Sequence, residues 1–423
     1  MARYRLLVVN HAVEIGGAER VLIRLLERLD RDLFEPALAC PHDGPLAREM
    51  AEKGISVHFG YPSPRLLEAK RKSLGSSRLT MVAYPYDLVR TVLGLTRLIR
   101  SGDYDLVITN SAKADIYGSL AGWLAGRPVV WRLHDIVTAE AFSRVNMRLF
   151  KTCASLFASR VLAVSGAARE AFVSLGVSRD KVRVVYNGID LEGADPKTDR
   201  EKVRAEWDVP THAPLVGMVG RLVDWKGPDI FLQAAAMMAE EMPEVYFMLV
   251  GDATFGEKDY VDVLKEMSVD MGMEKKVVFT GFREDVAEIM ASLDLLVHAS
   301  VLPDPLPTVL IEAMSLGLPV IAAAGGGVGE IVEDGVSGLV VPPGDVESMA
   351  GAALRMLCHP DEARRMGEAG RRRAAEMFDI EKRTREMEKE MLEVLAGADQ
   401  DTCRFKVNAG LSGRRSRGGK AWS

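Results

Sequence analysis

The chain has 423 residues and carries 54 basic and 60 acidic side chains, for a net charge of −6. This length predicts two domains, and a composition that is 48% hydrophobic and 27% charged is typical of globular rather than disordered proteins. The four cysteines are scattered without a CxxC pair, which argues against a disulfide framework and against a zinc site. Neither a signal-peptide pattern nor an apolar run approaching the ~18 residues of a membrane-spanning helix is found, so we expect a cytoplasmic protein.

The charges are unevenly divided along the chain. Residues 1–190 hold 27 basic and 19 acidic side chains, whereas the rest of the chain is acidic. A basic first half, which includes a cluster at Arg65–Arg78, predicts an anionic partner. This partner could be a membrane surface or a phosphorylated acceptor. An uneven distribution of solvated charged faces would give the same charge counts without any partner.

The first half alternates short apolar runs with stretches of helical period. RLLVVN (Arg5–Asn10) predicts a buried strand, and AERVLIRLLERL (Ala18–Leu29) predicts a helix. Further strands are expected at Asp105–Asn110, Pro128–Asp135 and Arg160–Ser165. Repeated strand–helix–strand units predict a parallel sheet with helices on both faces.

A turn-rich, charged segment at Tyr186–Lys202 indicates a domain boundary. Beyond it the alternation resumes, with strands expected at Pro214–Leu222, Val245–Asp252 and Lys276–Phe282. Two successive doubly wound α/β domains would place ligand-binding loops at the carboxyl ends of their strands. The predicted divisions are an N-terminal domain over 1–190, a linker over 191–210, a C-terminal domain over 211–378, a C-terminal helix over 379–398 and a basic disordered tail over 399–423.

The run PDPLPTVLIEAM carries two acids separated by two prolines. Pro305 and Pro307 keep Asp304 out of a helix, and Pro307 suits the first turn of one. Asp304 is therefore predicted in a loop, and Glu312 about one turn inside the helix that follows. The free amides and positive dipole end at that helix start favour a phosphate. Acids in such apolar surroundings need partners, which sugar hydroxyls or a structural arginine would supply.

Two cations in VGRLVDWKG, Arg221 and Lys226, are predicted on a loop between a strand and a helix. Arginine can fork across two oxygens of a pyrophosphate and lysine adds a point charge, although ordinary surface cations give the same pattern. Gly16 and Gly17 join the first strand to the first helix and would permit close approach of a phosphate or sugar. Without a GxGxxG motif, a dinucleotide site is not favoured.

Two further segments follow predicted strands. AGGGVGEIV is a glycine-rich turn with Glu330 at the start of a helix, and His134 lies where α/β enzymes place functional groups. Simple tight turns and a structural histidine are the alternative interpretations. The sequence has no GxSxG, P-loop or HExxH motif and no cluster of metal-ligand residues, so no metal site is predicted.

Taken in order, these segments resemble the retaining glycosyltransferases of family 4. The resemblance runs from Arg5 to about Leu395 and includes GGAER, VYNGID, GRLVDWKG, VVFTGFREDV, the two-acid run and GLVVPPGD. It implies the GT-B fold, with two facing Rossmann-like doubly wound domains and a central cleft. It also implies transfer of a hexose from a UDP- or GDP-sugar to a glycan, lipid-linked saccharide or small acceptor, in the synthesis of cell-surface polysaccharide or glycoconjugate.

The resemblance also implies roles for single residues. Arg221 and Lys226 would hold the donor's diphosphate. Asp304 would approach the donor sugar, and His134 would contact that sugar near the reacting carbon. The other donor-binding positions that it implies are Gly16 and Gly17 in the loop over the donor, Thr308 and Val309 at the phosphates, Glu312 at the ribose, Phe282 and Arg283 at the base, and Glu330 near the nucleotide.

Three positions depart from the family's pattern. Its usual Glu-Pro-Phe-Gly is here Asp304-Pro305-Leu306-Pro307, so the acid is one methylene shorter and one amide donor is lost. Gly329 stands where proline is common. The resemblance implies retention by front-face departure and attack, with catalysis by positioning and charge neutralisation and with no metal or other cofactor required.

Two other functions stay open at this point. The first is a nucleotide-sugar epimerase, which shares the two-domain architecture. The second is a non-catalytic nucleotide-sugar-binding protein, which the altered Asp304–Pro307 segment suggests. The expected partners are a nucleotide sugar and a glycan or lipid-linked acceptor, with peripheral contact at the inner face of an anionic membrane as a further hypothesis. No nucleic-acid partner is expected.

Overall fold

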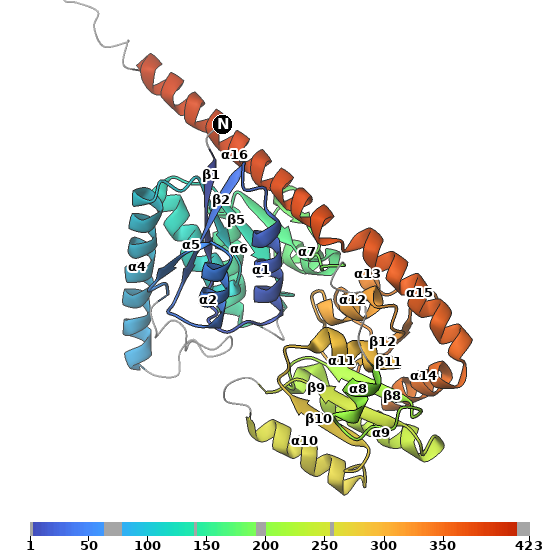
Figure 1. The fold of residues 1–423 in the computed structure, drawn as a ribbon. Coiled ribbons are helices and arrows are strands. Elements are labelled where there is room, and N and C mark those ends of the chain that lie inside the picture. Colours follow the sequence, from blue (N-terminus) through green and yellow to red (C-terminus); the bar gives the residue numbers. More distant parts are fainter. Residues whose placement is uncertain (1–2, 63–77, 139–141, 192–199, 254–257, 413–423) are drawn as a thin grey trace, which may run out of the picture. The chain divides into compact units, whose positions relative to one another are not determined.

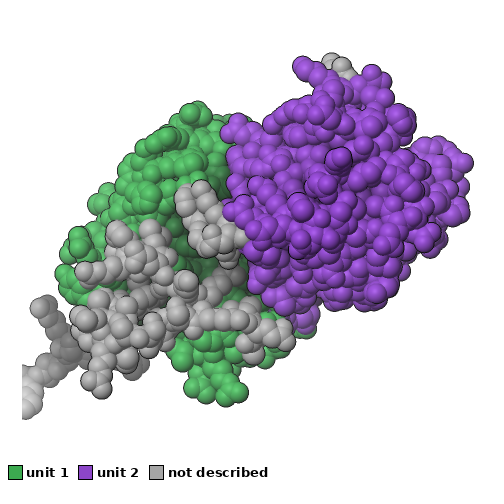
Figure 2. All heavy atoms as spheres, turned by 90° about the horizontal axis from the view of Figure 1, so that it is seen from below, with its two compact units in different colours: residues 1–163, 172–185, 384–423 green, residues 164–171, 186–383 purple. Residues whose placement is uncertain are grey.

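The computed structural model describes residues 3–62, 78–138, 142–191, 200–253 and 258–412 (Figure 1). Contacts between residues divide the chain into two compact units, coloured separately in Figure 2. Unit 1 comprises Met1–Ala163, Phe172–Val185 and Thr384–Ser423, and unit 2 comprises Val164–Ala171 and Tyr186–Arg383. Each unit contains one parallel β-sheet.

The sheet of unit 1 has seven strands in the order β3-β2-β1-β4-β5-β6-β7. They are β1 (Tyr4–Val9), β2 (Phe34–Cys40), β3 (Ser56–Phe59), β4 (Leu106–Thr109), β5 (Val129–Leu133), β6 (Arg160–Ala163) and β7 (Val182–Val184). The helices are α1 (Gly17–Arg28), α2 (Pro45–Glu52), α4 (Arg78–Ser101), α5 (Ala112–Ala125), α6 (Arg144–Leu156), α7 (Gly166–Ser174), which continues from unit 2, and α16 (Ile380–Ser412). The strand order reverses between β1 and β4, which pair in parallel.

The central strands of unit 1 are buried on both faces, as their continuous apolar sequences predict. Leu6 and Val8 of β1 belong to a core cluster that also contains Leu22 of α1 and Met387 and Met391 of α16. The C-terminal helix is therefore part of the core of unit 1.

Helix α16 is longer than the sequence predicted. The expected helix ended at residue 398 and a disordered tail followed, whereas α16 continues to Ser412. No proline occurs after Pro360, so nothing in the covalent chain stops the helix at residue 398. The last part of the predicted tail, residues 413–423, lies outside the described residues.

The sheet of unit 2 has six strands in the order β10-β9-β8-β11-β12-β13. They are β8 (Leu215–Val219), β9 (Tyr246–Val250), β10 (Val277–Gly281), β11 (Leu295–His298), β12 (Val320–Ala323) and β13 (Leu339–Val341). The helices are α8 (Arg200–Ala205), α9 (Pro228–Glu241), α10 (Lys258–Asp270), α11 (Val286–Ser292), α12 (Thr308–Ser315), α13 (Val328–Ile331), α14 (Val346–Cys358) and α15 (Pro360–Met377). The strand order reverses between β8 and β11.

Helices cover both faces of the second sheet. One core cluster joins Val216 of β8 to Phe231 of α9 and Met349 of α14. A separate cluster joins Leu215, the preceding strand residue, to Leu310 of α12. Successive strand residues thus face opposite layers, and the predicted doubly wound, Rossmann-like architecture is confirmed in both units.

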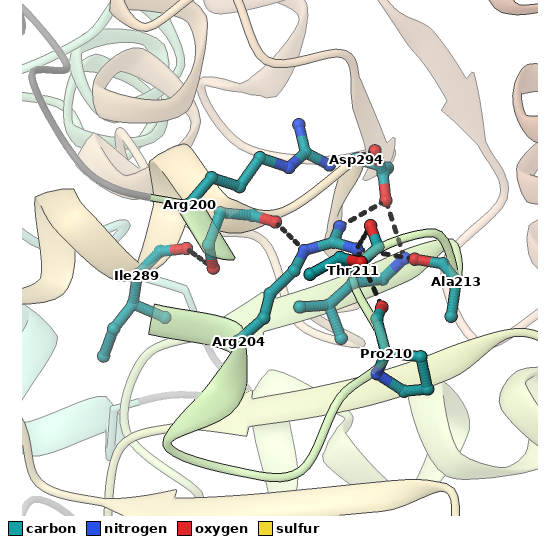
Figure 3. A network of polar contacts seen from close by, with 9 residues as sticks. Arg200, Arg204, Pro210, Thr211, Ala213, Ile289 and Asp294 are labelled. Carbon is teal, nitrogen blue, oxygen red and sulfur yellow. Dashed lines mark hydrogen bonds and ion pairs between the residues drawn. The ribbon is translucent and has the colours of Figure 1, made fainter. Parts of the chain in front are cut away.

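Arg204 fastens α8 to the rest of unit 2 (Figure 3). Its side chain is 1% exposed and pairs with Asp294 at 2.7 Å. It also donates to the backbone carbonyls of Ser292 at 3.0 Å and Ala213 at 2.7 Å. Burial lowers the pKa of Arg204, while Asp294 favours the charged form. Part of the predicted linker is therefore a helix held within unit 2.

Candidate active site

The loops after β8 and β11 meet at the strand-order reversal of unit 2, the position where open α/β sheets bind ligands. Gly227 ends the first loop with φ +67, and a side chain there would place Cβ 2.2 Å from the carbonyl oxygen of Ala299. The amide of Val301 donates to the carbonyl of Trp225 at 2.9 Å. These contacts require glycine at position 227 and hold the two loops together.

Lys226 and Asp304, which the sequence places 78 residues apart, form an ion pair at this point. The Lys226 ammonium donates to Oδ2 of Asp304 and also lies 4.4 Å from the centre of the Trp225 ring. Their side chains are 18% and 9% exposed, so this is a largely desolvated pair. The structure brings together two of the predicted catalytic residues.

His298, which the sequence analysis did not single out, completes this cluster. Its Nε2 lies 3.6 Å from Oδ2 of Asp304 and 3.0 Å from Oγ of Ser300. Burial lowers the pKa of His298, an effect that Asp304 opposes. In the segment DLLVHAS, this histidine ends a predicted strand, which is the kind of position that drew attention to His134.

Asp304 is ionised at neutral pH despite its burial. Burial by itself raises the pKa of this carboxyl, but Lys226 and His298 together hold the pKa well below its usual range. The site therefore presents a fixed carboxylate beside an ammonium, both oriented by the loops that carry them.

Arg221 lies on the same loop as Lys226 but is exposed. Its side chain makes no hydrogen bond or ion pair with any residue that the structure describes. An exposed guanidinium next to a lysine at a sheet's reversal point is suited to an anionic ligand.

Helix α12 begins at Thr308, close to the start predicted at Pro307, and Asp304 lies in the loop before it, as predicted. Pro307 is its N-cap with φ −67, and Thr308 and Val309 form its half-buried first turn. The first amides of a helix have no partner within it and carry the positive end of its dipole. Glu312 is half-buried about one turn further along the same helix.

The glycine-rich turn after β12 packs against the backbone of Asp304. Gly326 has φ +57, and a Cβ at this position would lie 1.9 Å from the carbonyl oxygen of Asp304. The amide of Gly327 donates to the same oxygen at 2.8 Å. The turn thus positions the loop that carries Asp304, which is a structural role.

Glu330, predicted near the nucleotide, is engaged by protein groups. Its carboxylate accepts hydrogen bonds from the amides of Gly166 at 2.7 Å and Ala167 at 2.9 Å, at the start of α7. It also accepts from the hydroxyl of Tyr186 at 2.9 Å, and burial followed by this bond raises the pKa of Tyr186 to about 12. Its predicted contact with a nucleotide stays a prediction.

Phe282 and Arg283 follow β10, the edge strand of the sheet, two strands away from β8. Phe282 is 67% exposed. Arg283 donates to the carboxylates of Asp285 at 2.7 Å and Glu206 at 2.8 Å, which raise its pKa. Their predicted role at the base also stays a prediction.

In unit 1, Gly16 and Gly17 lie at the start of α1. Glu19 accepts hydrogen bonds from the amide of Gly16 at 3.1 Å and from Nδ2 of Asn10 at 3.3 Å. A side chain at Gly17 would meet nothing within 4 Å. The open space at Gly17 is compatible with the predicted approach of a ligand.

His134 follows β5 and is held by Asn110, which sequence reasoning missed. Nε2 of His134 lies 3.0 Å from Oδ1 of Asn110, and Arg132 donates to the same oxygen at 2.7 Å. Because an amide oxygen only accepts, Nε2 carries the proton. Burial and then Arg132 hold the pKa of His134 well below its usual range, so the ring is neutral.

No group of three or more His, Cys, Asp or Glu side chains among the described residues could hold a metal ion. None of the described helices has the length and apolarity needed to cross a membrane.

Known proteins are similar to this chain along nearly its whole length. The structure resembles Anabaena Alr3699/HepE in complex with UDP, with 31% identity, a TM-score of 0.80, and coverage of 92% of this chain and 100% of that one. The same Anabaena protein has been solved with UDP-glucose. An Escherichia coli UDP-Gal:alpha-D-GlcNAc-diphosphoundecaprenol alpha-1,3-galactosyltransferase is 26% identical over 350 residues, covering 81% of this chain and 85% of that protein.

A D-inositol 3-phosphate glycosyltransferase of Corynebacterium urealyticum is 27% identical over 371 residues, covering 78% of this chain and 84% of that protein. Two family profiles match successive parts of the chain: Glycosyltransferase Family 4 over residues 15–192 and Glycosyl transferases group 1 over residues 199–373. With the two Rossmann-like sheets described above, these matches show that the chain belongs to the group 1, family 4 glycosyltransferases and has the GT-B fold.

Proposed function

We propose that this glycosyltransferase moves a hexose from a UDP-sugar to its acceptor with retention of configuration at the anomeric carbon. The observation that carries the proposal is the buried Lys226–Asp304 pair at the β8/β11 reversal, with Arg221 on the same loop and the start of α12 next along the chain. The Anabaena relative solved with UDP and UDP-glucose supports a uridine nucleotide.

The cations of the site would stabilise the departing diphosphate. The side chain of Arg221 is exposed and makes no bond to a described residue, so it can take up a phosphate without breaking a protein contact. Lys226 would share its three donors between Asp304 and the diphosphate. Positive charges that are already in position before the reaction lower its activation barrier, because the protein need not reorganise as the diphosphate leaves.

The transfer itself needs one bond broken and one formed. The bond from the anomeric carbon to the diphosphate oxygen breaks, and the acceptor hydroxyl oxygen bonds to that carbon on the same face. The hydroxyl proton passes to the departing diphosphate. Ionised Asp304 would hold a hydroxyl of the donor sugar, so catalysis is chiefly positioning and charge stabilisation.

We propose that the acceptor carries phosphate and is linked to a lipid at the inner face of a membrane. The Escherichia coli relative is named for a diphosphoundecaprenol-linked acceptor, and the Corynebacterium relative for inositol 3-phosphate. Residues 1–190 carry 27 basic and 19 acidic side chains, which suits an anionic acceptor.

A donor screen tests the proposed function. UDP-, GDP- and ADP-linked glucose and galactose are compared by thermal shift and by hydrolysis without acceptor, with the configuration of the released sugar determined by NMR. We expect stabilisation by UDP-sugars and slow release of UDP with a sugar of retained configuration. An epimerised donor would show an epimerase, and binding without turnover on any acceptor would show a non-catalytic protein.

A further inference from the structure

Helices α4, α5 and α6 cover one face of the sheet in unit 1. A side chain at Gly118 of α5 would meet Val9 of β1 and Thr109 of β4, so α5 packs on the face that these residues share. The opposite face, with Leu6 and Val8, packs in a different core cluster. Helix α5 contacts both α4 and α6, so the three form one layer with an outer side of its own.

The outer side of this layer is unusually apolar. On α4, Tyr86, Val89 and Leu93 are 65%, 55% and 44% exposed, at a spacing that puts them on one stripe of the helix. Of the fourteen exposed large hydrophobic side chains in the described residues, seven belong to these three helices. They are Tyr86, Val89, Leu93, Trp123, Leu124, Val145 and Leu156.

The same stripe of α4 is basic. Arg90, Arg97 and Arg100 are exposed and lie among the three apolar residues on one side of the helix. The described side chains of the three helices include two acids, Asp87 and Asp115, and these are 5% and 1% exposed. Within the described parts of these three helices, the exposed charged side chains are therefore all basic. An exposed acid, Asp103, follows the end of α4 and pairs with Arg127 at 2.7 Å.

The apolar surface continues from α4 onto the ends of its neighbours. Arg100 donates to the carbonyl of Leu124 at the end of α5. The ring of Trp123, in the last turn of α5, lies 5.3 Å from the ring of Phe157, which directly follows α6. This contact joins the ends of the two helices. We call the α4 stripe together with Trp123, Leu124 and Leu156 the α4–α6 surface.

We propose that the α4–α6 surface docks on an anionic lipid bilayer. Arginines interspersed with exposed apolar side chains on one side of a helix are the combination that binds the headgroup region, where the apolar groups enter and the cations meet phosphates. Exposed Tyr86 and Trp123 add the aromatic groups that favour that boundary. The described residues of the three helices present no exposed carboxylate that an anionic membrane would repel.

This inference rests on the proposed lipid-linked acceptor, because it names the surface with which the protein would reach the membrane. It is tested without any transfer reaction, so the membrane surface and the proposed function can fail independently. The full chain is floated with vesicles of phosphatidylcholine alone or with 30% phosphatidylglycerol. The test variant is Arg90→Ser/Arg97→Ser, and a second variant is Tyr86→Ser/Leu93→Ser. The matched control is Arg371→Ser/Arg372→Ser, which removes two exposed arginines from α15.

We expect binding to the anionic vesicles that weakens with salt and is much weaker on neutral ones. The arginine variant should bind about 30-fold more weakly, as expected from about 1 kcal/mol for each cation near an anionic surface, and the control should bind as the unaltered chain does. Equal losses in the test and control variants would overturn the proposal. So would failure of the unaltered chain to float, or self-association through this surface in sedimentation without vesicle binding.

Discussion

Asp304 is one methylene shorter than the glutamate usual in the family, and one of its carboxylate oxygens, Oδ2, is held by protein groups. It accepts a hydrogen bond from Lys226, and Nε2 of His298 lies 3.6 Å away. Gly327 holds its backbone carbonyl at 2.8 Å. The side chain is short and its loop is held in place, so the carboxylate cannot move toward a sugar. A donor sugar must therefore bind close to it.

Replacing Asp304 with asparagine tests this role at constant shape. Asp304→Asn removes the charge that favours the sugar's transition state, so we expect kcat to fall about 100-fold or more. UDP affinity should change little, because Arg221 and the helix start remain. Steady-state kinetics and calorimetry with UDP measure the two effects, and Asp304→Glu, which restores the usual acid, should retain more activity. Equal losses of transfer and UDP binding would place Asp304 outside the sugar site.

The sequence predicted the positions of these residues but not their contacts. Asp304 and Lys226 were assigned separately to sugar and diphosphate, and their pairing depends on two loops that meet only in the folded sheet. His298 and Asn110 were missed because a polar residue at a strand end does not by itself indicate which distant side chain it contacts. Each becomes visible through its partner, Asp304 for the first and His134 for the second.

Among the elements, the turn after β12 has little freedom to change. Its Gly326 is in the left-handed region at φ +57 and lies against the backbone of Asp304. The sequence left this segment open between a ligand loop and a tight turn. The structure supports the second interpretation, because the glycines make room for another loop.

Gly326→Ala should therefore move the loop that carries Asp304. A Cβ 1.9 Å from a carbonyl oxygen must displace it, and the positive φ adds strain, so we expect a loss of about 2 kcal/mol or more in unfolding free energy together with most of the activity. Gly329→Ala is the control, since a side chain there meets nothing within 4 Å. Both variants are compared by urea unfolding and by transfer assays. If they behaved alike, the glycine at position 326 would not be needed to position the loop of Asp304.

Strands and helices were easier to predict than the turns. β1, β4, β8 and β9 each appear as continuous apolar runs because a parallel sheet buries both faces of its strands. The prolines around Asp304 fixed the start of α12. By contrast, the extension of α16 to Ser412 lay in a polar, glycine-containing stretch whose composition favoured disorder.

Across the whole chain, the two units are not two continuous segments. Residues 164–171 belong to unit 2 although the residues on both sides belong to unit 1, and the chain returns to unit 1 at Thr384. Sequence patterns indicate where one sheet ends and another begins, but they do not show which core a later helix joins. The predicted domain limits and the cleft between the domains remain predictions.

Two arginines on α8 share Asp294 and provide a matched test of how this helix is held in unit 2 (Figure 3). Arg204→Ala would leave several buried carbonyls without a donor, so we expect a loss of about 3 kcal/mol in unfolding free energy. Arg200, 44% exposed, makes a surface pair with the same acid, and Arg200→Ala should cost less than about 1 kcal/mol. Similar losses in urea unfolding would show that the Arg204 network does not anchor α8.

We propose that the largely desolvated Lys226–Asp304 pair at the sheet reversal of unit 2 is required for glycosyl transfer. The most direct measurement is turnover by Lys226→Ala of the donor that the screen identifies, beside Lys275→Ala as an exposed lysine control. We predict that turnover falls by about 1,000-fold or more, since the charge that stabilises the leaving diphosphate is lost, while the variant stays folded with a lowered melting temperature because Asp304 loses its partner. Near wild-type transfer by a folded Lys226→Ala protein would contradict the account.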